Sequence, residues 1–302
     1  MSPAAPVLAV DIGGTKVDAA VVTAAGEVVR ASVARRPTGR DTSREGIAAN
    51  IRAAAEEALA AVPELRVGAI GVGSAGPVDL PARSVSPLNL PQAAGLPIDE
   101  VLAGLVDGPI SLALDGTCIA LAEHWRGALV GTQNAMAIVV STGVGGGLIL
   151  GGRPISGASG NAGHLGQTFV RTLETDAAAA TLEAVAAGPG SVAWARTQGW
   201  VGETGLDLAA AYREGDAVAV AAVRRSASAV GQAIAAAATL CDLEAVAIAG
   251  GFSHVADDYV DLVAAAAVAA SVHAYARRCR VVPSGLDGDG PLLGAAALAL
   301  GA

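Results

Sequence analysis

Two segments of the chain share one pattern of apolar and polar positions. Residues 7–29 and 135–155 each begin with an apolar, β-branched run, break at a glycine-rich turn and then resume as a second apolar run. This pattern predicts a strand, a polar glycine turn, a second strand, a tight turn and a third strand. The unit recurs after about 130 residues, which indicates an internal duplication. We expect the two glycine turns to face each other across a cleft.

Helices and strands alternate through the rest of the chain. Apolar spacing and alanine content predict helices at 46–61, 117–125, 182–197, 206–212, 217–240 and 294–300. Apolar runs predict further strands at 67–72, 110–114 and 245–249. Alternating strands and helices form parallel sheets, so the sequence predicts an α/β protein.

Composition and charge narrow the possible classes of protein. The chain has 302 residues, of which 53% are hydrophobic and 16% charged, so we expect two domains with buried cores and exclude disorder. A net charge of −9 argues against nucleic acid as the main partner. Three widely spaced cysteines indicate neither a disulfide framework nor a thiolate zinc site. With no signal peptide and no apolar run long enough to span a bilayer, we expect a soluble, cytoplasmic protein.

The two glycine turns are candidates for binding phosphate. DIGGTK, residues 11–16, follows a predicted strand, where glycines let the backbone approach an anion and successive N–H groups form a nest for phosphate oxygens. Because a strand follows it, the motif is neither a Walker loop nor a Rossmann fingerprint. STGVGGG, residues 141–147, is a second turn of the same kind. Together the two turns can hold one polyphosphate from both sides.

Other polar and glycine positions have more than one interpretation when taken alone. Asp115 follows a predicted strand, so it is either a carboxylate in the cleft or the N-cap of the next helix. A polar series in a Gly/Ala-rich region and a glycine pair after a strand are weak signals by themselves: Asn161, His164, Gln167 and Glu183, and Gly250 with Gly251.

Taken in order, the motifs resemble those of the ROK family, which contains repressors, uncharacterised proteins and sugar kinases. The matching motifs are DIGGTK (11–16), AGPVD (75–79), D-x₇-E followed by His (115–124), STGVGGGLI (141–149), GNAGHLG (160–166), LEA (182–184), AGG (249–251) and GPLLGAA (290–296). The resemblance covers nearly the whole chain and implies the two-lobed actin-like fold of hexokinases, also called ribonuclease H-like. The smaller lobe would comprise residues 1–115 with the C-terminal helix, about 290–302, packed back on it, and the larger lobe residues 116–289.

The resemblance also implies an activity and a site. It implies phosphorylation of a hexose or amino-hexose at the 6-hydroxyl, with ATP and Mg²⁺ as cofactors, Asp115 as the base and a homodimer as the assembly. The positions that match ATP- and phosphate-binding residues are Asp11, Gly13, Gly14, Thr15, Lys16, Thr142, Gly143, Gly145, Gly250 and Gly251, with Asp11 also near Mg²⁺. The positions that match sugar-binding residues are Gly76, Asn89, Leu114, Asp115, Asn161, His164, Gln167 and Glu183.

Three positions depart from the family pattern. Sugar kinases of the family commonly have Asn directly before the base, where this chain has Leu114. They also have the motif G-x-A-G-E-x-G-H, in which this chain has His164 in place of Glu and Gln167 in place of the last His. By resemblance, the first two positions face carbons 3 and 4 of the sugar, Gln167 faces carbon 1 and Glu183 faces carbons 1 and 2. Altered recognition beside a retained base favours a sugar other than glucose. Kanosamine, 3-amino-3-deoxyglucose, is our leading hypothesis, with glucose and N-acetylmannosamine left open.

The same region bears on zinc and on two other functions. Many family members follow that histidine with a cysteine-rich zinc loop, but residues 168–181 contain no cysteine, so we expect no structural zinc.

A repressor is disfavoured by the acidic charge and by a first strand that begins near Val7, which leaves no room for a DNA-binding module. A noncatalytic sugar-binding protein is disfavoured by Asp115 and both phosphate turns. ATP turnover stimulated by a sugar would discriminate it from a kinase.

Overall fold

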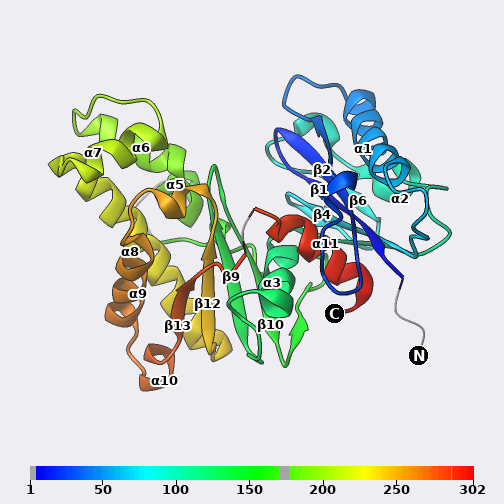
Figure 1. Ribbon diagram of the computed structural model, residues 1–302. Helices are drawn as coiled ribbons and strands as arrows, with labels where there is room; N and C mark the ends of the chain where they lie inside the picture. Colours follow the sequence, from blue (N-terminus) through cyan, green and yellow to red (C-terminus); the bar gives the residue numbers. More distant parts are fainter. Residues whose placement is uncertain (1–4, 171–176, 287) are drawn as a thin grey trace. The chain divides into compact units, whose positions relative to one another are not determined.

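The structure is a computed structural model that describes residues 5–170, 177–286 and 288–302 (Figure 1). The chain divides into two compact units, which are described separately. Unit 1 comprises Met1–Val130, Pro154–Ala162 and Leu286–Ala302, and unit 2 comprises Gly131–Arg153 and Gly163–Gly285. No helix among the described residues is long and apolar enough to cross a membrane.

Unit 1 is built on a five-stranded sheet in the order β3-β2-β1-β4-β8. Its strands are β1 (Val7–Ile12), β2 (Lys16–Val22), β3 (Ala34–Pro37), β4 (Ile70–Ser74) and β8 (Ile110–Leu114). β1, β2 and β3 are antiparallel neighbours, whereas β1, β4 and β8 run parallel. The carboxyl ends of β1, β4 and β8 therefore meet at one edge of the sheet.

Helices cover both faces of this sheet. On one face, α1 (Arg44–Ala60) packs Ile47 and Ile51 against alternate residues of β1 and β2. The other face packs against α3 (Asp115–Arg126) and α11 (Gly290–Leu300). Smaller elements complete the unit: a three-stranded sheet of β5 (Val78–Asp79), β6 (Ser84–Val85) and β7 (Leu96–Pro97), the helix α2 (Ile98–Val101), and the 3₁₀ turns Arg30–Ser32 and Pro91–Ala93.

Close backbone contact explains why α3 belongs to unit 1. Gly294 of α11 lies against the backbone of Cys118, so that any side chain at 294 would overlap the Cys118 carbonyl. The Cys118 thiol in turn lies under Gly73 of β4. The lobes predicted from the sequence place residues 116–130 and 154–162 in the larger lobe, whereas the contacts group both segments with unit 1. The two lobes proposed from the sequence remain a prediction.

Unit 2 repeats the arrangement with a sheet in the order β11-β10-β9-β12-β13. Its strands are β9 (Ala135–Val140), β10 (Val144–Leu150), β11 (Arg153–Pro154), β12 (Ala245–Ala249) and β13 (Arg280–Pro283). Its helices are α4 (Ala177–Ala180), α5 (Leu182–Ala186), α6 (Gly188–Thr197), α7 (Gly205–Arg213), α8 (Ala217–Cys241), α9 (Tyr259–Ala270) and α10 (Ala274–Arg277), with 3₁₀ turns at Leu165–Gln167 and Gly251–His254.

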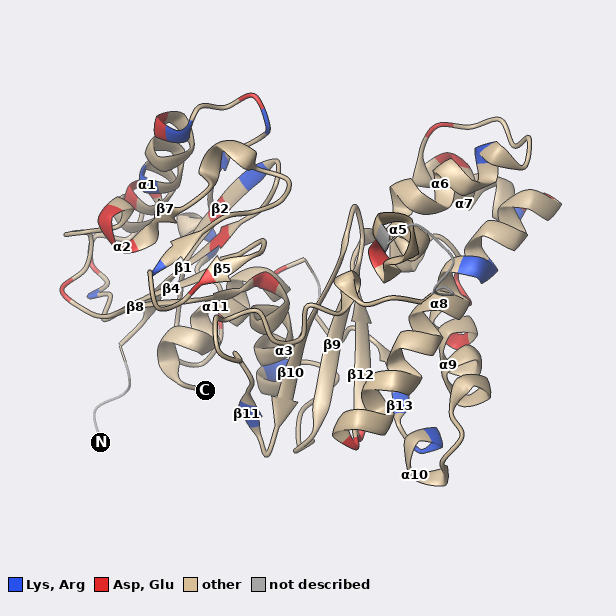
Figure 2. Cartoon of the chain, turned by 180° about the vertical axis from the view of Figure 1, so that it is seen from behind, with Lys and Arg blue, Asp and Glu red and all other residues tan. Residues whose placement is uncertain are grey.

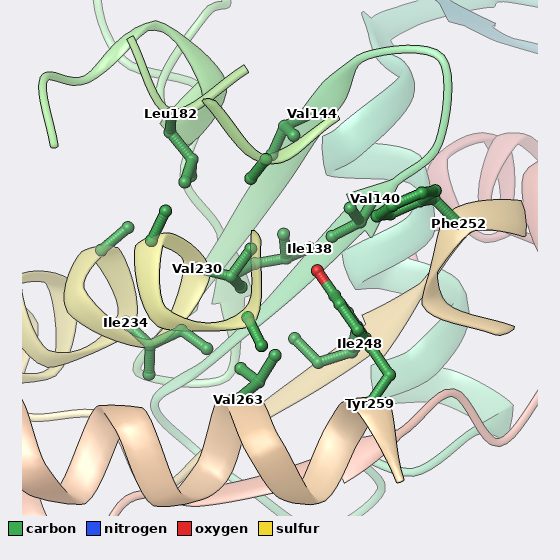
Figure 3. Close-up of a cluster of buried hydrophobic side chains, with 14 of the residues drawn as sticks. Ile138, Val140, Val144, Leu182, Val230, Ile234, Ile248, Phe252, Tyr259 and Val263 are labelled. Carbon is green, nitrogen blue, oxygen red and sulfur yellow. The ribbon is translucent and has the colours of Figure 1, made fainter. Parts of the chain in front are cut away.

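The core of unit 2 lies between this sheet and helices α8 and α9. Figure 3 shows Ile138 and Ile248 of the sheet beside Val230 of α8 and Val263 of α9. The hydroxyl of Tyr259, the largest fully buried side chain, lies 2.8 Å from Ser226 Oγ. The buried polar atom is thus paired, and the two helices are joined through it.

The duplicated units and most elements agree with the sequence predictions. The strands at 110–114 and 245–249 and the first two strands of each duplicated unit are confirmed. The third strand of the first unit is wrong as predicted: Val28 forms only an isolated bridge to Val22, and the strand that follows β2 in the sheet is β3, further along the chain. The helix predicted over 182–197 is wrong as one element: it breaks at Ala187, because Pro189 starts a new helix, α6. The strand predicted at 67–72 is shifted to 70–74, and the last helix already begins at Gly290.

Candidate active site

Two carboxylates lie together at the carboxyl edge of the unit 1 sheet. Asp11 occupies the end of β1, and Asp115 follows β8 directly as the first residue of α3. The charge of Asp115 raises the pKa of Asp11, as expected for close neighbours. Leu114 is the N-cap of α3, so the alternative that Asp115 caps this helix is wrong. Oδ1 of Asp115 accepts a hydrogen bond from the Gly116 N–H at 2.6 Å.

Asp11 is held in an environment that disfavours its charge. Burial raises its pKa to about 7, with smaller contributions in the same direction from Asp115 and Asp18 and an opposing one from Lys16. A carboxyl group with this pKa exchanges its proton near neutral pH. A bound cation favours the ionised form, so the pair of carboxylates suits a divalent metal.

The first glycine turn, residues 13–15, is braced from behind. The N–H of Gly13 donates to the carbonyl of Lys16 at 2.9 Å, which closes the turn between β1 and β2. Thr38 Oγ1 donates to the Gly13 carbonyl at 2.8 Å, and the Thr38 N–H donates to the Thr15 carbonyl at 2.9 Å. Within the described residues, nothing accepts from the N–H of Gly14 or Thr15. These donors suit a phosphate oxygen.

Asn89 lies directly against this turn. A Cβ built at Gly14 would overlap the Asn89 side-chain amide, so a larger residue at position 14 would displace Asn89 from the turn. The Leu88 N–H donates to the carbonyl of Gly76 at 3.0 Å, which ties Gly76 to the segment that carries Asn89. The structure thus brings one predicted sugar-binding residue, Asn89, beside the predicted phosphate turn.

Two other predicted sugar-binding residues of unit 1 have structural contacts. The Asn161 side chain pairs with the backbone of Val78, because its Oδ1 accepts from the N–H at 2.9 Å and its Nδ2 donates to the carbonyl at 2.7 Å. The amide therefore docks residues 154–162 on β5. Leu114 is 1% exposed within the apolar core and offers no polar group to a ligand.

In unit 2, Glu183 joins the second glycine turn to the predicted sugar-recognition residues. The N–H of Val144 donates to Glu183 Oε2 at 2.9 Å, and Gln167 Nε2 donates to Oε1 at 3.2 Å. A Cβ built at Gly143 would lie 2.5 Å from Oε2. The turn itself is closed by the Ser141 N–H, which donates to the Gly143 carbonyl at 2.8 Å. Glu183, Gln167 and Gly143 form one cluster, which includes α5.

His164 lies near this cluster and is half-buried. Burial lowers its pKa, and the negative charge of Glu183 opposes that effect. This shift favours the neutral imidazole, in which one nitrogen can accept a hydrogen bond and the other can donate.

The remaining predicted nucleotide residues also lie in unit 2. Thr142 lies in the second turn, and Gly145 lies in β10 opposite Val139. Gly250, at the end of β12, has a φ of +99° and approaches the Val140 carbonyl too closely for any side chain. Gly251 begins the next 3₁₀ turn, and a Cβ at this position would lie 3.9 Å from Ser141 Oγ. The glycine pair is therefore a neighbour of the second phosphate turn.

The predicted site residues are shared between the units. Unit 1 holds Asp11, Gly13, Gly14, Thr15, Lys16, Gly76, Asn89, Leu114, Asp115 and Asn161, and unit 2 holds Thr142, Gly143, Gly145, His164, Gln167, Glu183, Gly250 and Gly251. Sequence reasoning missed Thr38; its only signal was a threonine directly after an extended segment. The described residues contain no group of three or more His, Cys, Asp or Glu side chains placed to hold a metal ion. Of the segment predicted to lack zinc, residues 171–176 lie outside the described part.

Comparison with known proteins identifies the family. The model of the ROK family matches residues 7–302. The chain belongs to the ROK family. This ROK protein is 35% identical over 269 residues to an N-acetylmannosamine kinase of Yersinia pseudotuberculosis serotype O:1b (strain IP 31758), covering 86% of this chain and 87% of that protein.

Solved structures of the family agree with the fold. The ROK hexokinase from Thermus thermophilus is 30% identical, with a TM-score of 0.83 and 97% of each chain covered. A ROK family glucokinase from Streptomyces griseus, in complex with glucose and AMPPNP, is 28% identical, with a TM-score of 0.80 and coverage of 98% of this ROK protein and 100% of the glucokinase. The predicted actin-like α/β fold of ROK sugar kinases is confirmed.

Proposed function

We propose that Asp115 is the base with which this ATP-dependent sugar kinase activates the 6-hydroxyl of a hexose or amino-hexose. The observation that carries the proposal is the position of Asp115. Its carboxylate lies at the carboxyl edge of the parallel strands, beside Asp11 and in the unit that carries the first phosphate turn. The relatives that are sugar kinases support the same chemistry.

Phosphoryl transfer from ATP to the sugar requires mainly that the reacting groups are positioned and that negative charge on the phosphates is stabilised. A carboxylate within hydrogen-bond reach orients the sugar hydroxyl and takes its proton as the new O–P bond forms. The N–H groups of Gly14 and Thr15, with the hydroxyls of Thr15 and Thr142, bind phosphate oxygens of ATP. Gly250 and Gly251 let the adenosine lie close to the backbone.

The residues of unit 1 fit the Mg²⁺ that the family implies. Carboxylate oxygens are the protein ligands that Mg²⁺ prefers. Burial, and after it the charge of Asp115, raises the pKa of Asp11, and a bound cation would favour the ionised carboxylate. Asp11 would hold the hydrated ion, which when bound neutralises charge on the nucleotide phosphates.

An amino-hexose with its nitrogen at carbon 3 is the substrate that we favour. When neutral, the His164 imidazole accepts a hydrogen bond from an amino or hydroxyl group at carbon 3, whereas a protonated imidazole would repel an ammonium group. Leu114 adds no polar partner for a 3-hydroxyl. Kanosamine has these features. N-acetylmannosamine is the second candidate, because relatives with this activity are 35% identical to the chain, and glucose is the third.

The test is a phosphorylation screen with Asp115→Asn. Kanosamine, glucose, glucosamine, mannose and N-acetylmannosamine are offered with ATP and Mg²⁺, and ADP release is measured. In Asp115→Asn we expect the rate to fall by about 10²–10⁴-fold with AMPPNP affinity retained. The matched control is Asp79→Asn, an exposed carboxylate of unit 1. Near-normal turnover in Asp115→Asn refutes the base, and no sugar-stimulated ADP release in the wild type favours a noncatalytic sugar-binding protein.

The assembly and compartment implied by the family belong to the same proposal. We expect a cytoplasmic homodimer that binds its sugar and ATP and neither nucleic acid nor membrane. Light scattering of the purified protein at micromolar concentration measures the mass of the particle in solution.

A further inference from the structure

A buried carboxylate next to the first phosphate turn holds two exposed cations. Asp18 of β2 is 9% exposed. Its Oδ2 lies 2.9 Å from Lys16 Nζ, while Arg35 donates from Nε to Oδ1 at 2.5 Å and from Nη2 to Oδ2 at 3.0 Å. Burial alone raises the pKa of Asp18, but hydrogen bonds from Arg35 and Lys16 outweigh it and leave the pKa below its ordinary value. The lowered pKa favours the ionised carboxylate of Asp18, which lies between the two basic side chains.

Strand register places this cluster beside Asp11. Asp18 is the cross-strand partner of Asp11 on β1 and of Arg35 on β3. Direct cross-strand partners point to the same face of a sheet, and so does Lys16, two residues from Asp18 on β2. This is the face that α3 covers, since Ala9 and Ala20, the alternate neighbours of Asp11 and Asp18, pack with α3 and α11. Figure 2 shows acidic and basic positions together on β2.

Lys16 and Arg35 both have N–H groups that can donate to an acceptor other than Asp18. The side chains of Lys16 and Arg35 are 46% and 61% exposed. Arg35 binds Asp18 through Nε and Nη2, and within the described part of the chain no acceptor takes Nη1. Lys16 lies directly after the turn, and it is the only lysine in a chain with 19 basic residues. Two cations fixed by one carboxylate beside a nest of N–H groups suit a polyphosphate.

We propose that Arg35 is a further nucleotide-binding residue and that Asp18 is a positioning residue, which holds Arg35 and Lys16 to bind the terminal phosphates of ATP. The inference rests on the proposed kinase function and adds the residues that orient ATP, the phosphate donor. Long basic side chains lose rotamer freedom when they bind an anion. Asp18 restricts them in advance, so less of that entropy is lost on nucleotide binding.

Kinetics separates this role from a purely structural ion pair. In Arg35→Met and Lys16→Met, whose side chains are exposed, we expect KM for ATP to rise about 10- to 100-fold and KM for the sugar to stay unchanged. Asp18→Asn should produce the same pattern. The matched control is Asp99→Asn, because Arg83 binds Asp99 in the same two-bond manner, at 2.9 and 2.8 Å, elsewhere in unit 1. If Arg35→Met shifts the melting temperature but not KM for ATP, the ion pair only fastens β3 to β2 and the inference is wrong.

The single lysine allows a direct spectroscopic readout. Reductive methylation with ¹³C-formaldehyde labels Lys16 and the N-terminal amine and keeps the positive charge. The signal that is missing from labelled Lys16→Met identifies the Lys16 resonance. The Lys16 resonance should move on addition of Mg²⁺–AMPPNP and stay in place with AMP, which lacks the terminal phosphates. In Arg35→Met the movement should need a higher AMPPNP concentration.

Calorimetry on the same labelled sample distinguishes failure of this inference from failure of the proposed kinase function. If AMPPNP binds and the Lys16 resonance does not move, the inference is overturned while the kinase function stands. If AMPPNP does not bind, the proposed kinase function is overturned and the inference with it.

Discussion

Replacing Asp11 by Asn should stabilise the fold while removing activity. The pKa of Asp11 is raised from 3.8 to about 7, so the folded protein binds a proton that the unfolded chain releases over this range. The free energy of unfolding therefore falls as pH rises from about 4 to about 7 and stays low above that. A difference of about 3 between the two pKa values corresponds to at most about 4 kcal/mol. Because Asp11 is only partly buried, we expect about half of this.

Asparagine has the same shape and no charge, so Asp11→Asn recovers this free energy at pH 8 and none at pH 4. For a chain of this length, about 2 kcal/mol raises the melting temperature by about 4 °C. Thermal unfolding of both proteins is followed at pH 4.5, 6 and 8 with EDTA and without nucleotide, so that neither metal nor ATP compensates the charge. A constant difference across this pH range, or a variant less stable than the wild type at pH 8, would refute the reasoning.

Three further predictions concern specificity, metal and packing. If His164 and Leu114 set selectivity at carbon 3, Leu114→Asn with His164→Glu should shift the ratio of kcat/KM for kanosamine and glucose toward glucose; an unchanged ratio contradicts this assignment. Elemental analysis should find no stoichiometric zinc, and the fold should survive EDTA while activity needs added Mg²⁺. Gly294→Ala should lower stability by about 2 kcal/mol or more, since its Cβ meets the rigid backbone of Cys118, whereas Gly288→Ala, with open space around it, should not.

The sequence was informative where structure is local. Both strand–turn–strand units were predictable, because alternating apolar residues and a glycine turn are read within about twenty residues. The break at Ala187 was missed, although Gly188 and Pro189 are a local signal that interrupts the apolar spacing. The short strands β5, β6 and β7 were missed because a strand of two residues has no period to detect.

In the candidate site, too, the sequence indicated individual residues but not the contacts between distant segments. The order of the motifs indicated which side chains to examine. The brace from Thr38 and the pairing of Asp18 with Arg35 depend on β3 lying beside β2 in one register, which no single segment specifies. The Asn161 amide could not be assigned to the backbone of Val78 without that tertiary contact.

The setting of Cys118 has a consequence for redox chemistry. Burial raises the pKa of this thiol, and the negative charges of Asp11 and Asp115 raise it further. Burial likewise raises the pKa of Cys241 and brings that of Cys279 to about 11. Thiolates, not thiols, react with peroxide, alkylating agents and disulfides. Burial, with the two carboxylates of the candidate site adding to it, thus keeps the Cys118 sulfur in its unreactive thiol form, so oxidants and alkylating agents should leave this sulfur unmodified in the folded protein.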